Sequence, residues 1–334
     1  MPIRPRMAMR ILASGLLMAM ALAFVLQPLG QEAQGEGGLL IVVSFPNIAC
    51  DVELLALGDD EVVALAPPGM DPHEYQLTPD DIELLKGADI IVSTAHTPFE
   101  MEIRELHDRG EISGILVEIP RIPGIRIMEN PATGQPNYHM PIYDPGNYKV
   151  FITYLASLMA ELRPGKQDSY LSKAEATVGT IDSLLDRAPR LDLAAVADLP
   201  FTQYAVSWLG IDIRFLLVKE HGVPATPGDL LRIEEAISSG KVCLAVVCEP
   251  ATPSASRQLR ELATEHGLPI LYVPSPLSPR GTLEKLEQVA ERASGLHPPA
   301  PGSPGAWDAK VGLALASTLL VLVALTVILS REVR

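Results

Sequence analysis

Two histidines of this chain occupy similar turns, and their residue type indicates metal chemistry. His73 lies in "PPGMDPHEYQLTPDD" and His139 lies in "NYHMPIYDPGN", and each precedes a helix start marked by Thr78 or Asp144 followed by proline. Neutral imidazole held in a fixed loop is the commonest protein ligand for transition metals. Either histidine alone is equally well explained by packing within its loop. Together they favour one shared metal site.

The elements around His73 predict where its side chain lies. An apolar run, Val62 to Ala66, reads as a buried strand, and the segment from Thr78 to Gly87 has the start and stop signals of a helix. His73 therefore falls in the loop at the carboxyl end of a strand. Open α/β sheets bind their ligands at that edge.

Strands and helices alternate twice along the chain, which predicts an α/β fold with two similar lobes. Each lobe is expected to hold a four-stranded parallel sheet, and a long backbone helix at 165–189 is expected to join the N-terminal lobe (37–164) to the C-terminal lobe (190–296). The expected strands are 39–45, 61–66, 88–93 and 115–119 in the first lobe, and 193–198, 212–218, 242–248 and 269–273 in the second.

Both ends of the chain have the composition of membrane-directed segments. Residues 1–30 combine three early arginines with an uncharged apolar run, as expected of a signal peptide or signal anchor. Residues 311–329 are uncharged and long enough to span a bilayer, and the tail 330–334 carries two arginines. A proline- and glycine-rich linker, 297–310, precedes this predicted transmembrane helix. We expect both lobes to lie outside the cytoplasm, anchored to the cell membrane by the C-terminal helix.

Composition excludes several other classes of protein. A net charge of −15 argues against a nucleic-acid partner, because phosphate binding needs basic patches. Three cysteines, Cys50, Cys243 and Cys248, cannot all pair within one chain, and the last two should face opposite sides of one strand. The sequence contains no G-x-S-x-G or H-E-x-x-H motif and no phosphate-binding glycine loop, so an enzyme is not expected.

The two histidine segments resemble the signature segments of metal-binding solute-binding proteins of ABC importers. "PPGMDPHEYQLTPDDIELLKGADIIV" and "YHMPIYDPGN" carry the resemblance, which extends over roughly residues 39–293. It implies a monomeric receptor that captures zinc or manganese outside the membrane and delivers the ion to an ABC permease, with no organic cofactor. It also implies two lobes joined by a rigid helix, a metal bound in the cleft between them, and His73 and His139 as ligands from the N-terminal lobe.

The C-terminal lobe departs from the family pattern at both expected ligand positions. Leu199 stands where the resemblance implies a histidine, and Ser275 stands where it implies a carboxylate. Three nearby residues are candidate replacements because each lies near the carboxyl end of a strand: Asp198, Glu249 and His221. Each has an ordinary alternative, as a helix cap, a structural hydrogen-bonding group and a surface loop residue respectively. The thiol of Cys248 is a further candidate, and His96 is expected to have a structural role.

Two other functions stay open from the sequence. The missing C-lobe ligands would suit a scaffold that has lost its metal site and serves as an interaction or adhesion module at the cell surface. A metal-dependent hydrolase would need an open coordination position and a general base, for which Glu74, directly after His73, is the candidate. We rank this last reading lowest.

Overall fold

The first sheet consists of four short parallel strands that are apolar along their length. In this computed structural model, which describes residues 37–220 and 222–296, the strand order is β2-β1-β3-β4. The central residues Ile41 to Val43 are fully buried, as expected of a parallel sheet covered by helices. The strands are β1 (Leu40–Val43), β2 (Glu61–Ala64), β3 (Ile90–Ser93) and β4 (Ile115–Glu118), and the helices between them are α2 (Pro46–Glu53), α3 (Pro79–Gly87) and α4 (Pro98–Asp108).

The second sheet repeats this design in the C-terminal lobe. Its four strands are parallel and follow the order β10-β9-β5-β6. A separate antiparallel pair, β7 (Val218–Glu220) and β8 (Val223–Pro224), was not predicted. The sheet strands are β5 (Leu193–Ala197), β6 (Ile211–Leu216), β9 (Leu244–Glu249) and β10 (Ile270–Pro274), with helices α7 (Thr202–Ser207), α8 (Pro227–Ser238), α9 (Ser254–His266) and α10 (Thr282–Ser294). The predicted α/β fold with two lobes of parallel strands is thus confirmed.

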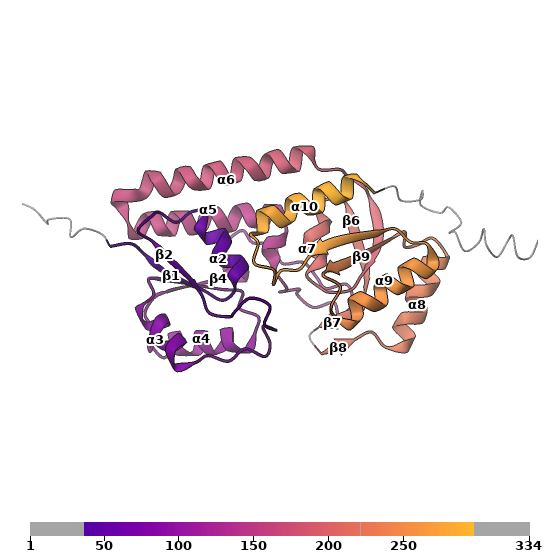
Figure 1. Ribbon diagram of the computed structural model, residues 1–334, viewed down its shortest axis with the longest axis horizontal. Coiled ribbons are helices and arrows are strands. Elements are labelled where there is room, and N and C mark those ends of the chain that lie inside the picture. Colours follow the sequence, from indigo (N-terminus) through magenta and orange to yellow (C-terminus); the bar gives the residue numbers. More distant parts are fainter. Residues whose placement is uncertain (1–36, 221, 297–334) are drawn as a thin grey trace, which may run out of the picture. The chain divides into compact units, whose positions relative to one another are not determined.

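Two packed helices lie between the sheets along the chain. Helix α5 (Pro145–Leu162) ends at a proline-containing 3₁₀ turn, η3 (Pro164–Lys166), and α6 (Gln167–Arg187) then runs alongside α5 and leads into β5 (Figure 1). Arg163, at the junction, is almost fully buried and pairs with Asp59 at 2.6 Å and Asp60 at 2.8 Å. These ion pairs tie the junction to the loop before β2.

Helix α10 returns from the second sheet to the first lobe. Its first residue, Thr282, donates through both its backbone N–H and its hydroxyl to Asp51 of α2, each at 2.6 Å, and Tyr148 of α5 donates to the same carboxylate at 2.8 Å. Leu286 of α10 belongs to the hydrophobic core of the N-terminal lobe. Burial raises the pKa of Asp51 to about 6 despite these three donors.

The predicted membrane segments fall outside the part of the chain that the structure describes. This holds for the signal segment 1–30, the linker 297–310, the transmembrane helix 311–329 and the tail 330–334. Within residues 37–220 and 222–296, no helix combines the length and the apolar composition that crossing a bilayer requires. Cys50, Cys243 and Cys248 are all free thiols, so Cys243 and Cys248 do not pair with each other, as expected.

Candidate metal site

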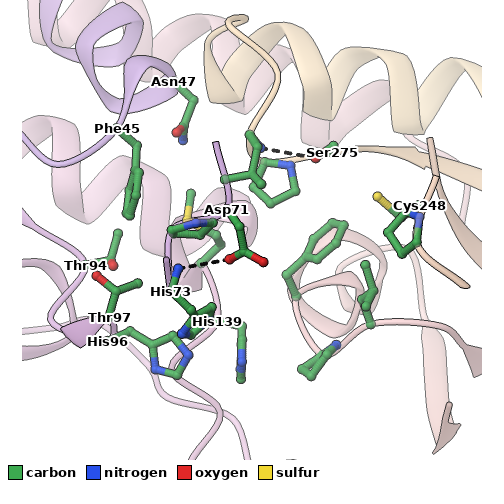
Figure 2. A pocket seen from close by; sticks show the side chains of 18 of the residues that line it. Phe45, Asn47, Asp71, His73, Thr94, His96, Thr97, His139, Cys248 and Ser275 are labelled. Carbon is green, nitrogen blue, oxygen red and sulfur yellow. Dashed lines mark hydrogen bonds between the residues drawn. The ribbon is translucent and has the colours of Figure 1, made fainter. Parts of the chain in front are cut away.

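A pocket of about 380 Å³ lies where the carboxyl ends of strands from both sheets meet (Figure 2). From the first sheet, residues that follow β1, β2 and β3 line it: Phe45, His73 and His96. From the second sheet, residues at the ends of β5, β9 and β10 line it: Leu199, Cys248 and Ser275. This is the edge at which open α/β sheets hold their ligands.

A short turn fixes the backbone at His73. The His73 N–H donates to the Asp71 carboxylate at 2.9 Å, and Asp71 also lines the pocket. A capping box follows, in which Thr78 accepts from the Asp81 N–H at 3.2 Å and the Asp81 carboxylate accepts from the Thr78 N–H at 2.7 Å. The start of α3 therefore anchors the loop that carries His73.

His139 is oriented by a buried asparagine two residues earlier. The Asn137 Oδ1 lies 3.0 Å from the His139 Nδ1, while the Asn137 Nδ2 donates to the Pro200 carbonyl at 2.9 Å and to Gln203 at 2.8 Å. Because Nδ2 is engaged as a donor, Oδ1 is the acceptor, and this arrangement places the histidine proton on Nδ1. The lone pair then belongs to Nε2, the nitrogen that can ligate a cation. Such outer hydrogen bonds are typical of metal-ligating histidines.

His139 Nε2 faces a carboxylate from β7. The Glu220 Oε2 lies 3.6 Å from this nitrogen. The other carboxylate oxygen, Oε1, accepts from the side chain of buried Asn130 at 3.0 Å. Glu220 is therefore held in place on the C-lobe side of His139 by a polar contact of its own.

His96 contacts both of the other pocket histidines. Its ring centroid lies 4.2 Å from that of His139 and 5.6 Å from that of His73. The loop is shaped by Glu100, a buried carboxylate that accepts from the backbone N–H groups of residues 94, 96 and 97. Glu100 thus stabilises the loop that carries His96 and does not belong to the pocket lining among the described residues. The three imidazoles lie together on one wall of the pocket (Figure 2).

The ligand groups in this arrangement do not amount to a complete coordination sphere. Across the described residues, no set of three or more His, Cys, Asp or Glu side chains is positioned to hold a metal ion together. Zinc takes four donors in most protein sites. A cation held here would need the rings to reorient around it or would bring further donors with it.

Residues 41–289 match the family described as the periplasmic component A of the zinc-uptake complex, ZnuA. The chain belongs to this family. The resemblance seen in the two histidine segments is thereby confirmed, and the description of the family is of a metal-uptake component rather than of a catalyst.

Relatives of known description fit this assignment. The zinc-binding protein TroA of Treponema pallidum is 27% identical over 184 residues, a region that spans 54% of this chain and 57% of TroA. The structure of FpvC from Pseudomonas aeruginosa in complex with Mn²⁺ superposes with a TM-score of 0.63 at 18% identity, covering 77% of this chain and 98% of FpvC. The laminin-binding protein Lmb of Streptococcus agalactiae, described as having adhesin and metal-transporting activity, gives a TM-score of 0.62 at 18% identity, covering 76% and 97%. These two structures share the two-lobed fold.

The structure of this ZnuA-family chain places the C-lobe candidate ligands Asp198 and Glu249 away from the pocket lining. Asp198 is fully buried and accepts from the Cys248 N–H at 2.7 Å, and burial raises its pKa to about 6. Glu249 pairs with Arg292 at 2.5 Å. Neither carboxylate is among the described residues that line the pocket. His221 lies outside the described residues, directly after Glu220.

Three of the C-lobe residues on the pocket wall, Leu199, Ser275 and Cys248, offer weak metal ligands or none. Leu199 and Ser275, at the positions where the resemblance implies metal ligands, both line the pocket. Burial raises the pKa of the Cys248 thiol to about 12, so this side chain is a neutral thiol.

Sequence reasoning missed Glu220 and Asn137. Asn137 gives a short local signal, because asparagine commonly bonds backbone groups two residues further on, as it does here with the His139 N–H at 3.1 Å. Glu220 gives none, since it belongs to a short polar strand without an apolar pattern. The contact between Glu220 and His139 joins segments far apart in the chain.

Proposed function

We propose that this chain captures a divalent transition metal, zinc or manganese, outside the cytoplasm and delivers it to an ABC permease. The observation that carries the proposal is the convergence of His73 and His139 on one pocket, with His96 in contact with both rings. The family assignment supports it, as do TroA, described as zinc-binding, and FpvC, observed with Mn²⁺.

In this proposal the ion lies between the lobes, with His73 and His139 as N-lobe ligands. Glu220 is the best placed C-lobe carboxylate, 3.6 Å from His139. His221 stays a predicted ligand because it adjoins Glu220. Asp198 and Glu249 also stay predictions, and each would have to give up its present partner, the Cys248 N–H or Arg292, to reach an ion in the pocket.

The receptor works as a monomer tethered to the membrane. Support for the tether is the uncharged segment 311–329, followed by arginines, and the predicted signal segment 1–30 supports export. Approach of the lobes around the ion would mark the loaded state, and docking on the permease would distort the site and release the ion.

Calorimetric titration of the purified full-length chain with Zn²⁺ and with Mn²⁺ tests the proposal. His73→Ala should weaken binding by at least about tenfold, since removing even an outer partner of a metal ligand costs 10–100-fold. His107→Ala, a histidine substitution on α4 outside the pocket, serves as the matched control and should bind as the unaltered chain does. Equal affinity in His73→Ala and the unaltered chain would remove the basis of the site.

A second function is favoured by one observation, the presence of Leu199 and Ser275 on the pocket wall. A scaffold that has lost its C-lobe ligands could serve as an interaction or adhesion module, and Lmb is described as having both activities. A folded chain that takes up neither Zn²⁺ nor Mn²⁺ in the same titration would support this reading.

A further inference from the structure

We infer that the pocket receives its cation as a complex with a small organic chelator rather than as a bare ion, an inference that rests on the proposed metal-capture function. The pocket measures about 380 Å³. Donors around zinc lie only 2.0–2.3 Å from the ion, so a bare ion with its ligands would fill a small part of this space. Pockets of about 300–1,000 Å³ are typical of sites for small organic molecules.

The three imidazoles that could bind a metal lie on one wall of the pocket. Figure 2 shows His73, His96 and His139 on one side and Ser275 and Cys248 across the space from them. The C-lobe wall is largely apolar, with Leu199, Phe201, Val218, Pro250 and Leu277. Glu220 faces His139 at 3.6 Å, but no three described His, Cys, Asp or Glu side chains form a set that could hold an ion. An ion held by the imidazoles would therefore obtain its remaining donors from a ligand it carries.

The apolar wall gives the organic part of such a ligand a surface to contact. Sites for small molecules combine many apolar side chains with a few placed polar groups, as found here. Burial of an aromatic or aliphatic chelator against Leu199 and Leu277 removes apolar surface from water, which favours the complex over the bare ion.

The charged residues at the pocket determine which net charge of a metal complex is favoured. Of the described residues that line it, none is lysine or arginine, while Asp71 lines it and Glu220 contacts His139. An anionic chelate would meet these carboxylates directly, with no lysine or arginine among the described lining residues to compensate them. The geometry and charge therefore fit a neutral or cationic metal complex with an apolar body.

The test compares four probes on the purified full-length chain by calorimetric titration. They are Zn²⁺ alone, Zn²⁺ with one equivalent of 2,2′-bipyridine, Zn²⁺ with citrate, and bipyridine alone. We expect the zinc–bipyridine complex to bind at least about tenfold more tightly than Zn²⁺, which corresponds to about 1.4 kcal/mol. Zinc citrate should bind more weakly than Zn²⁺, and bipyridine alone should bind more weakly than its zinc complex.

Two variants that place a larger side chain on the apolar wall test whether this wall contacts the chelator. Leu199→Trp and Leu277→Trp come from different segments, are half-buried and leave the histidines untouched. Each should abolish the advantage of the bipyridine complex over Zn²⁺, measured as the ratio of the two affinities within the same variant. Leu231→Trp, at an exposed leucine on α8, is the matched control and should keep the advantage.

The outcomes separate this inference from the proposed function. If bipyridine strips zinc from the chain, or if bipyridine alone binds as tightly as its complex, the inference is overturned. It is also overturned if both tryptophan variants fold and keep the full advantage. If His73→Ala changes the affinity for neither Zn²⁺ nor its bipyridine complex, the metal-capture function itself fails.

Discussion

At the scale of single residues, the site depends on how a few side chains are oriented rather than on which residues are present. His139 presents Nε2 to the pocket because Asn137 occupies Nδ1. Asn137 can do so because Pro200 and Gln203 fix its amide. Outer partners of this kind set both the tautomer and the direction of a metal-ligating histidine.

Asn137→Ala should therefore weaken zinc binding by roughly 10–100-fold, although no atom of Asn137 is a ligand. The physical reason is that His139 loses the acceptor that selects its tautomer and its ring orientation. Calorimetric titration of the variant measures the loss. Thr226→Ala, which removes a helix cap on α8, lowers stability by about 1 kcal/mol without touching a histidine and controls for general destabilisation. Equal zinc affinity in Asn137→Ala and the Thr226→Ala control would show that the asparagine does not position His139.

The sequence predicted that two of the pocket histidines lie close together, while their role as metal ligands stays a prediction. His73 and His139 could be placed near each other because both precede helix starts, and the two rings line the same pocket. The side-chain direction of Asp198 could not be predicted, because the residue ends a strand and successive side chains at a strand point to opposite faces. Its carboxylate turns to the Cys248 N–H, within the protein, where burial raises its pKa.

At the scale of elements, apolar runs and helix caps predicted the eight strands of the two sheets. Their parallel pairing follows from the alternation of strands with helices. The β7–β8 pair was not predictable, because "VKE" and "VP" carry no apolar alternation. That short pair nevertheless supplies Glu220, the carboxylate that faces His139.

The link between α2 and α10 should make stability depend on pH. Asp51 has a pKa of about 6 in the fold, above the 3.8 of a free carboxyl, so the folded state holds its proton more tightly than the unfolded state does. Its contribution is fully present below about pH 4 and is lost as pH rises through 6, by up to about 3 kcal/mol. The free energy of unfolding should therefore fall less steeply between pH 4 and 7 in Asp51→Asn than in the unaltered chain.

Urea unfolding of both proteins at several pH values measures this difference. Asp198, with a pKa raised to about 6 as well, titrates in both proteins and does not distinguish them. If the free energy of unfolding changes with pH equally in Asp51→Asn and the unaltered chain, Asp51 keeps its ordinary pKa in the fold.

At the scale of the whole molecule, residues at the carboxyl ends of strands from both sheets line one pocket, and function depends on this arrangement. The N-lobe contributes the imidazoles, and the C-lobe contributes Leu199, Ser275 and an apolar wall. Helix α10 ties the lobes together through Thr282 and Asp51 and adds Leu286 to the N-lobe core. Family membership accounts for the scaffold.

The measurement that tests the account most directly is zinc K-edge X-ray absorption on the full-length chain loaded with one equivalent of Zn²⁺. The account predicts at least two imidazole ligands on the ion, and the loss of one imidazole in His73→Ala and of one in His139→Ala. An imidazole count that stays the same in both variants would contradict it, because the two histidines would then not bind a common ion.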